Sequence, residues 1–213
     1  MSQIQGLFLD LDGTLADSIL VLRKAFTNFM EQLGIKPNPG EFRDMAGVRL
    51  PEIMVFLKAH YGLSQSPDKL VDMYLHAIGD GYADHAKPAP GAYALLQAAQ
   101  ERGVHVAVVT SSPHQVADNF LGAHGLAAYV SNVVSADSVG QGKPHPEPFM
   151  TALQQAGLQA EQGLAVEDSV AGAKSALGAG LSTYLISLYD PHPEVQGVAG
   201  HISRLDELVV LLG

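Results

Sequence analysis

The sequence predicts an α/β fold in which helices cover both faces of a parallel sheet and an all-helical domain is inserted after the first strand. From residue 88 onward, short and almost wholly apolar runs alternate with helical patterns, as in a sheet buried on both faces. Residues 17–87 carry helical patterns and no convincing strand. The 213 residues are 47% hydrophobic, which allows a sizeable core in one or two domains.

The N-terminal part of the chain predicts one strand followed by helices. Residues 4–9 are apolar enough for a short buried strand. Ser18 can cap a helix whose apolar positions follow helical spacing until Gly34, and the same spacing predicts the helices 41–46, 51–60 and 67–84. We therefore expect a core domain of residues 1–16 and 88–213 and a helical domain of residues 17–87.

The remainder of the chain predicts strands and helices in alternation. A stiff linker at 87–91 precedes the first of these helices. The predicted strands are 104–109, 133–134, 163–166 and 183–186, with a last edge strand at 201–202. The predicted helices end at Arg102, start at Pro113 and Pro146, and span 169–179 and 205–212.

Charge and composition narrow the possible partners. The formal net charge is -10 with only 12 Lys and Arg, which argues against binding to nucleic acid or an anionic membrane. The lack of cysteine excludes disulfides, thiolate metal sites and a cysteine nucleophile, and it fits a reducing compartment. No signal peptide and no membrane-spanning run is apparent. We expect a cytoplasmic protein that is a monomer or a weak homodimer.

Four polar clusters follow predicted strands or open predicted helices. Each alone has an ordinary explanation as a turn, a helix cap, a surface lysine or an acidic helix start. Because ligands bind at the carboxyl ends of parallel strands, we expect the clusters to lie together. They are DLDGT at 10–14, TSS at 110–112, Lys143 in the loop VGQGKPHP, and EDS at 167–169.

Carboxylates crowded at one edge of a sheet require a cation or shifted pKa values. Oxygen ligands without cysteine or paired histidines suit a hard ion such as Mg²⁺. Magnesium together with a lysine and helix N-termini makes a site for a phosphoryl group. We therefore interpret Asp10 and Asp12 as flanking a metal ion and a phosphorus atom.

In order and approximate spacing, the four clusters resemble the four motifs of the haloacid dehalogenase (HAD) superfamily. The quoted residues are Asp10-Leu11-Asp12-Gly13-Thr14, Thr110-Ser111, Lys143-Pro144 and Glu167-Asp168-Ser169. The resemblance covers the whole chain, and the helical insert looks like the small cap domain of the phosphoglycolate phosphatase and β-phosphoglucomutase branch. It implies the Rossmann-like HAD core with an inserted all-helical cap.

The resemblance also implies a reaction. Asp10 would attack phosphorus and form an aspartyl-phosphate, and Asp12 would protonate the leaving alcohol and then activate water. Lys143 would bridge the phosphate and Asp10. The enzyme would be a Mg²⁺-dependent phosphatase for a small phosphorylated metabolite such as a sugar phosphate or phosphoglycolate, and the sequence does not name which ester.

Two sets of binding residues follow from the same resemblance. The metal would be held by the Asp10 carboxylate, the Asp12 backbone carbonyl and Asp168, with Glu167 either ligating it or lying just behind. The phosphate would be bound by Thr110, Ser111 and Lys143.

Three further residues are candidates for substrate contact. Gly47 is expected to form a tight turn that points into the site. Arg49 is either a contact to a charged or sugar substrate or a solvated loop residue. His114 is a candidate for lining the same cleft. The hinges of the cap are expected at 15–17 and 85–89.

Several alternatives share these motifs. A β-phosphoglucomutase-like mutase would have a histidine where Leu22 stands and an arginine later in the loop than Arg49, so we expect hydrolysis. Asp12 argues against a dehalogenase, because a halide leaves without a proton. A phosphonoacetaldehyde hydrolase needs a Schiff-base lysine, and neither Lys58 nor Lys69 lies in a recognisable context. A non-catalytic binding or regulatory protein with this fold is the remaining alternative.

Overall fold

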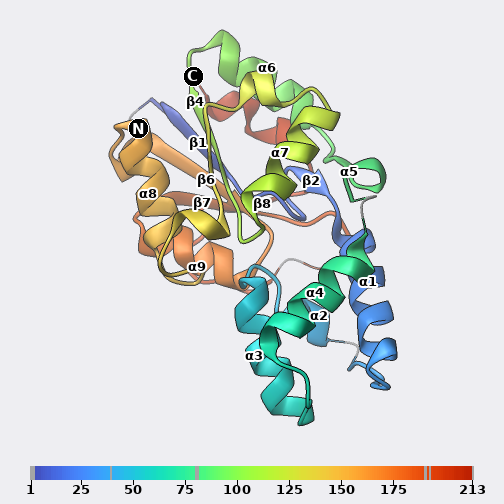
Figure 1. Cartoon of the computed structure of the whole chain (residues 1–213). Helices are drawn as coiled ribbons and strands as arrows, with labels where there is room; N and C mark the ends of the chain where they lie inside the picture. The colour runs from blue at the N-terminus through green and yellow to red at the C-terminus, as the bar shows by residue number, and fades with distance from the viewer. Residues whose placement is uncertain (1–2, 39, 80–81, 190, 192, 213) are drawn as a thin grey trace.

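The computed structural model describes residues 3–38, 40–79, 82–189, 191 and 193–212. Its main part is a six-stranded sheet of order β5-β4-β1-β6-β7-β8 (Figure 1). All pairs of neighbouring strands in this sheet are parallel, which confirms the predicted α/β fold. The strands are β1 (Gly6–Leu9), β4 (His105–Val109), β5 (Asn132–Val134), β6 (Gly163–Glu167), β7 (Ser182–Ile186) and β8 (Gly200–Ile202).

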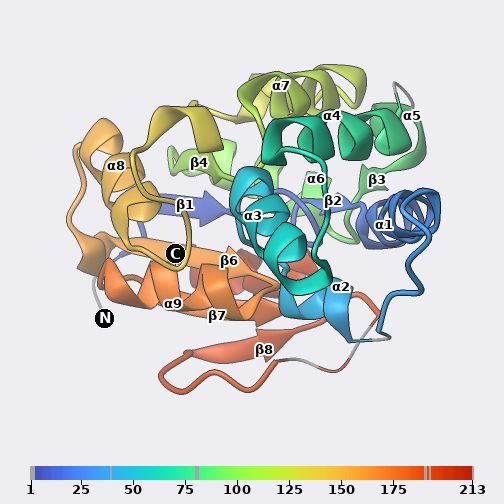
Figure 2. The same cartoon turned by 60° about the horizontal axis from the view of Figure 1, so that its bottom comes forward.

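Helices cover both faces of the sheet because the strands bury side chains on both. Leu7 and Leu9 of β1 pack into one core cluster, and Phe8 between them packs into the other. The first cluster lies under α6 (Ala92–Glu101), α7 (His114–Ala123) and the 3₁₀ helix η4 (Leu205–Leu211). The second lies under α8 (Glu147–Ala156) and α9 (Val170–Gly178), on the opposite face (Figure 2).

Shorter 3₁₀ helices connect these elements, and one of them replaces a predicted α-helix. The C-terminal segment expected as a helix over 205–212 is the 3₁₀ helix η4. The other three are η1 (Ala127–Tyr129), η2 (Ala136–Ser138) and η3 (Ala160–Gln162). None of the helices in the described part of the chain is long and apolar enough to cross a membrane.

The order of the strands determines where a ligand can bind. β1 lies at the centre, with β4 and then β5 on one side and β6, β7 and β8 on the other. The chain therefore proceeds in opposite directions across the sheet on the two sides of β1. In open parallel sheets, the carboxyl ends of the strands at such a reversal form a crevice that binds ligands.

The helical segment lies beside this edge and has a hydrophobic core of its own (Figure 1). That core consists of Phe26, Phe29, Met30, Met54, Leu57 and Leu70. Contacts of α4 with α1 and with α3 hold the segment together. Its helices are α1 (Ile19–Gln32), α2 (Glu41–Asp44), α3 (Leu50–Tyr61), α4 (Pro67–Ile78) and α5 (Tyr82–His85).

Two expectations for this segment were wrong. β2 (Ala16–Asp17) pairs antiparallel with β3 (Lys87–Pro88), so strands are present at both ends of the stretch expected to contain none. The two predicted hinges thus lie side by side. The helix expected over 67–84 ends at Ile78 because Gly79 follows with φ +69° and ψ -179°, an extended conformation with positive φ that favours glycine and ends the helix. Residues 80–81 of that expected helix lie outside the described residues.

Candidate active site

Asp10 directly follows the central strand β1 and is paired with a buried lysine. The Lys143 ammonium donates to Asp10 Oδ1 at 2.6 Å, to Glu167 Oε1 at 2.5 Å and to the Val109 carbonyl at 2.8 Å. These three bonds use all three of its protons. Asp10 is 5% exposed and Lys143 is 1% exposed. Lys143 is therefore a buried counter-ion of the two carboxylates and not a solvated surface residue.

The cluster carries more negative charge than Lys143 neutralises. Burial raises the pKa of Asp10 to about 8; the Lys143 ammonium opposes this rise, and the charge of Glu167 adds to it. Burial also raises the pKa of Asp168 well above its usual range, and the charges of Asp10 and Glu167 act in the same direction. Burial by itself would lower the pKa of Lys143, but Asp10 and Glu167 keep that pKa above its usual value. A cation would relieve the repulsion between these acids.

The donor set fits a hard divalent ion. Carboxylate oxygens of Asp10, Glu167 and Asp168 lie within 4.8 Å of one another. Glu167 is already committed to protein donors: Oε1 accepts from Lys143, while Oε2 accepts from the Ser169 hydroxyl at 3.0 Å and from the Asp168 amide at 3.2 Å. Asp10 and Asp168 are the carboxylates best able to become ligands, and Glu167 holds the lysine and the loop behind them.

Gly172 makes room for Glu167, and sequence reasoning did not identify it. A Cβ atom at position 172 would lie 1.9 Å from the carboxyl carbon of Glu167. Its backbone amide also donates to the Ser169 hydroxyl at 3.0 Å and thereby caps α9. The glycine is hidden in an ordinary helical pattern, so only the packing reveals its role.

Three hydroxyl groups hold the carboxylate of Asp12. Ser18 donates to Oδ1 at 2.8 Å, Ser112 donates to Oδ2 at 2.7 Å, and the Tyr82 hydroxyl donates to Oδ1. Burial raises the pKa of Tyr82 well above its usual value, and the charge of Asp12 adds to this rise, so the phenol stays protonated as a donor. These partners come from the start of α1, the start of α5 and the loop after β4.

Ser18 was expected as a helix cap, and a cap was the ordinary explanation for Ser112, but neither makes a capping bond. Ser18 occupies the N-cap position of α1 without a side-chain bond to the helix backbone. The N-cap residue of α7 is Pro113, one position after Ser112. Both hydroxyls donate to the Asp12 carboxyl group instead. Tyr82 was not identified from the sequence, because its position 70 residues away gives no local signal.

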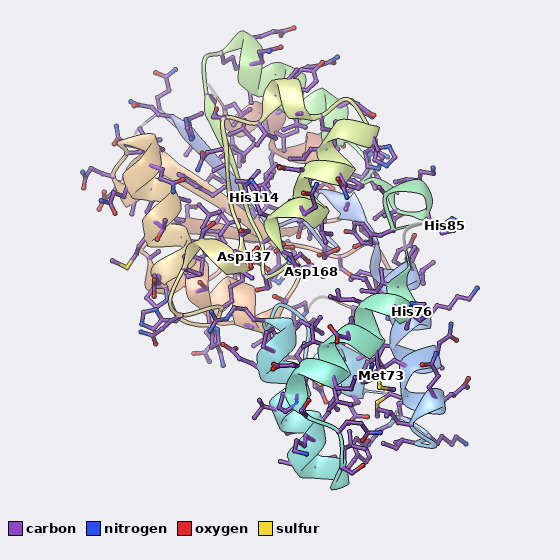
Figure 3. All side chains as sticks on the ribbon, viewed as in Figure 1. Met73, His76, His85, His114, Asp137 and Asp168 are labelled. Atoms are coloured by element: carbon purple, nitrogen blue, oxygen red, sulfur yellow. The ribbon has the colours of Figure 1, made fainter. Side chains whose placement is uncertain are left out.

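Thr110 and Ser111 follow β4 and line one cavity together with Asp10, Asp12 and Asp168. The Thr110 hydroxyl accepts from the Ser112 amide at 3.0 Å, which shapes the loop after the strand. The cavity has a volume of about 410 Å³ and lies between the carboxyl edge of the sheet and the helical segment. Figure 3 labels Asp168 where these two parts of the molecule meet.

Gly47 brings the loop of the helical segment onto the core. Its carbonyl accepts from the Ser111 hydroxyl at 2.6 Å, and its φ is +79°. A Cβ atom at this position would lie 2.3 Å from the Ser169 hydroxyl oxygen. Gly47 lines the cavity, so its loop does form a tight turn that faces the site.

Arg49 and His114 do not line this cavity. The Arg49 guanidinium pairs with Glu52, at 2.8 Å from Nε, and reaches the Gly140 carbonyl at 3.3 Å. It thereby ties the helical segment to the loop that precedes Lys143.

His114 lies at the start of α7 with its side chain half exposed (Figure 3). Its ring lies 3.4 Å from the Asp118 carboxylate, and its backbone amide donates to Asp137 at 3.0 Å. These contacts direct it along the helix surface and not into the site.

Comparison with known proteins identifies the family and the fold of the chain. Residues 7–186 match the family described as haloacid dehalogenase-like hydrolase. The chain is 28% identical over 216 aligned positions to 6-phosphogluconate phosphatase of Escherichia coli, covering 98% of this chain and 96% of that protein. It is 31% identical over 216 positions to phosphoglycolate phosphatase of Rhodospirillum rubrum, and the alignment covers 97% of this chain and 89% of that protein. CbbY from Rhodobacter sphaeroides, solved in complex with phosphate, has the same fold, with a TM-score of 0.84, 23% identity and 96% of both chains covered.

Proposed function

The chain belongs to the haloacid dehalogenase-like hydrolase family and is a phosphoric monoester hydrolase; we propose that it hydrolyses the phosphate ester of a small metabolite through a phosphorylated Asp10, with Mg²⁺ bound beside it. One observation carries the proposal. A buried aspartate paired with a lysine faces the same cavity as a second aspartate held by three hydroxyls. The absence of cysteine favours the cytoplasm as its location.

In the first step, a carboxylate oxygen of Asp10 attacks phosphorus and the bond from phosphorus to the alcohol oxygen breaks. Positioning and charge neutralisation carry most of the catalysis in such a transfer. Lys143 holds one oxygen of Asp10 and reduces its repulsion of the phosphate. Thr110 and Ser111 would bind phosphate oxygens at the cavity floor. Bound by Asp10, Asp168 and the Asp12 carbonyl, Mg²⁺ would neutralise the nucleophile and a phosphate oxygen.

Asp12 acts as the general acid in the first step and as the general base in the second. It gives a proton to the leaving alcohol and then takes one from the water that attacks the phosphorylated Asp10. The hydroxyls of Ser18, Ser112 and Tyr82 fix the direction of its carboxylate. Because Ser18 and Tyr82 belong to the two ends of the helical segment, the position of that segment and the orientation of Asp12 are linked.

We propose that residues 17–87 act as a cap that excludes water during the first step and opens to admit it for the second. The β2–β3 ribbon joins both connections to the core and supplies a natural hinge. Two contacts support the closed arrangement: the Ser111 hydroxyl to the Gly47 carbonyl, and the Arg49 guanidinium to the Gly140 carbonyl.

A phosphosugar mutase is the alternative with the same four motifs. Such an enzyme must keep the phosphorylated aspartate from water while a bound sugar phosphate reorients. Leu22 lines the cavity at the place where we expected a mutase to have a histidine. An apolar group there supplies no proton transfer to a sugar hydroxyl, which favours hydrolysis. Phosphorus NMR on β-glucose 1-phosphate with a trace of the 1,6-bisphosphate separates the two, since a mutase yields glucose 6-phosphate.

The proposed function predicts that phosphate release depends on Mg²⁺. In a panel of phosphate monoesters that includes p-nitrophenyl phosphate, we expect release with Mg²⁺, none with EDTA, and recovery when Mg²⁺ is restored. Mg²⁺ should also raise the melting temperature of the protein, because it binds only the folded carboxylate cluster. Ca²⁺ should inhibit because it prefers looser coordination. Full activity in metal-free buffer would contradict the proposal.

Removing the hydroxyl of Tyr82 tests the orientation of Asp12. We expect Tyr82→Phe to lower kcat roughly 10- to 150-fold and to leave KM nearly unchanged, since a hydrogen bond to a charged acceptor contributes roughly 1.5–3 kcal/mol. Tyr93→Phe is the matched control, because that hydroxyl donates to the His124 carbonyl on the surface. A Tyr82→Phe enzyme with the wild-type kcat would show that the contact does not serve catalysis.

A further inference from the structure

The two walls of the 410 Å³ cavity differ in chemistry. The floor on the core side carries the carboxylates and the hydroxyls described above. The wall formed by the helical segment is mostly apolar, with Tyr74 and Tyr82 as its phenols, and it includes Leu22, Phe26, Phe42, Met54, Leu75 and Ile78. A phosphate on the floor would therefore present its alcohol to a hydrocarbon surface.

Among the described residues that line this cavity, none is Lys, Arg or His, and the charged ones are Asp10, Asp12 and Asp168. Two cations of the helical segment that lie near this wall in sequence, Arg49 and Lys58, are engaged elsewhere, whereas Arg23 lies over the ring of the lining residue Phe42. Arg49 pairs with Glu52, and the Lys58 ammonium donates to the carbonyls of Leu63 and Gln65, each at 2.7 Å. Positions 80 and 81 lie outside the described residues and are Asp and Gly in the sequence.

A neighbouring cavity of about 630 Å³ does carry cations, at Arg23, Arg43 and Lys174. It shares Ile19, Phe42, Ala46, Val48 and Asp168 with the first cavity but is lined by neither Asp10 nor Asp12. The proton donor must reach the oxygen that leaves with the alcohol, so the alcohol lies on the side of Asp12. The apolar cavity is therefore the one that receives the leaving group.

We infer that the physiological substrate is the monophosphate of an uncharged alcohol with a substantial apolar face, about one or two six-membered rings in size, and that esters carrying a carboxylate or a second phosphate are poor substrates. The inference rests on the proposed function. A carboxylate placed against this wall would lose its hydration without gaining a cationic partner, and the acids on the floor would repel it. An apolar ring would gain from the same burial. This substrate class differs from phosphoglycolate and 6-phosphogluconate, for which two relatives are named.

The test is a comparison of kcat/KM at saturating Mg²⁺ for benzyl and cyclohexylmethyl phosphate against phosphoglycolate and 6-phosphogluconate. We expect a preference of at least roughly 100-fold for the two uncharged alcohols. Equal or better turnover of the anionic esters would overturn the inference and leave the phosphatase assignment intact. Failure to release phosphate from every ester, p-nitrophenyl phosphate included, would overturn both. If the enzyme prefers anionic esters and Arg43→Gln loses that preference, the alcohol binds in the neighbouring cavity. This result would also overturn the inference.

Leu75 offers a second, independent test. It lines the cavity from α4 and is 39% exposed, so a lysine there can keep its ammonium partly hydrated without unfolding the helix. We expect Leu75→Lys to raise the ratio of kcat/KM for phosphoglycolate over that for benzyl phosphate by about tenfold, through attraction of the carboxylate. Leu75→Met is the matched control and should leave the ratio unchanged. An unchanged ratio in a folded Leu75→Lys enzyme would show that the alcohol does not lie against α4, contrary to the inference.

Discussion

Replacing Asp10 by asparagine is expected to lower turnover by at least about 10⁴-fold, because the amide cannot form the phosphorylated intermediate. The fold should survive the change. Burial raises the pKa of Asp10 to about 8 in the metal-free protein, so at pH 7 the folded state favours its neutral form. A neutral amide of the same shape should therefore leave the melting temperature unchanged or slightly higher. Phosphate release and thermal unfolding in EDTA measure the two effects.

The matched control for this change is Asp118→Asn on α7. Its carboxylate is half exposed and lies 3.4 Å from His114, away from the cavity. We expect this variant to keep the wild-type kcat. Residual hydrolysis by Asp10→Asn clearly above the uncatalysed rate would mean that another group is the nucleophile. Loss of cooperative unfolding in Asp10→Asn would instead make Asp10 a structural residue.

Replacing Lys143 by methionine is expected to damage both stability and catalysis. Methionine has a similar length but cannot neutralise Asp10 and Glu167, which are both buried. Breaking a buried ion pair from one side costs about 3–5 kcal/mol of the free energy of unfolding. Activity should fall by a factor of about 100 or more, because the nucleophile loses its counter-ion. Urea unfolding and phosphate release measure these losses, and Lys174→Met on the exposed side of α9 is the control.

The destabilisation should depend on pH in a defined direction. The folded pKa of Asp10 already lies above its unfolded value of 3.8, and the variant loses the opposing Lys143 charge, so that pKa rises further. Acids with raised folded pKa values bind more protons in the folded state, and stability therefore falls as pH rises above the unfolded pKa. In EDTA we expect the destabilisation by Lys143→Met, relative to the wild type, to be nearly constant below about pH 7 and to grow as pH rises past about 8, the folded pKa of Asp10 in the wild type. A loss of stability that does not change with pH would show that the effect comes from packing alone.

A double variant separates lost charge from lost packing. If the cost of Lys143→Met comes from an uncompensated Glu167, then adding Glu167→Gln should restore part of the stability. The cost of the pair would then be smaller than the sum of the two single costs. Additive costs would show that Lys143 and Glu167 do not interact across the 2.5 Å contact between them.

Local patterns in the sequence predicted most of the fold. The run Leu7-Phe8-Leu9 is apolar at every position because β1 is buried on both faces, and the same holds for Val106 to Val109. Helical spacing located α1 and α3 to within a few residues. The hydrophobic pattern did not predict β2 and β3. These strands have two residues each and exist only because they pair with one another.

The grouping of the candidate site residues was also predictable from the sequence, since these polar residues are concentrated after strand ends. Asp10, Asp12, Thr110, Lys143 and Asp168 were all expected near one edge of the sheet. Parallel topology brings the carboxyl ends of β1, β4 and β6 together, and the structure gathers these residues there. Residue type and position relative to a strand were sufficient for this prediction, because both are properties of the local sequence.

Only the tertiary structure decided how these groups are held and what faces them. Ser18, Ser112 and Tyr82 hold Asp12 from three separate elements, and Arg49 turns toward Glu52 and Gly140 and away from the cavity. The physical reason is that such contacts depend on how distant segments pack. The sequence by itself determined the sheet, the helices and the acids and lysine at the strand ends. The packing of the helical segment determined the partners of Asp12 and the mostly apolar wall of the cavity, because no local pattern records which side chains meet across a cavity.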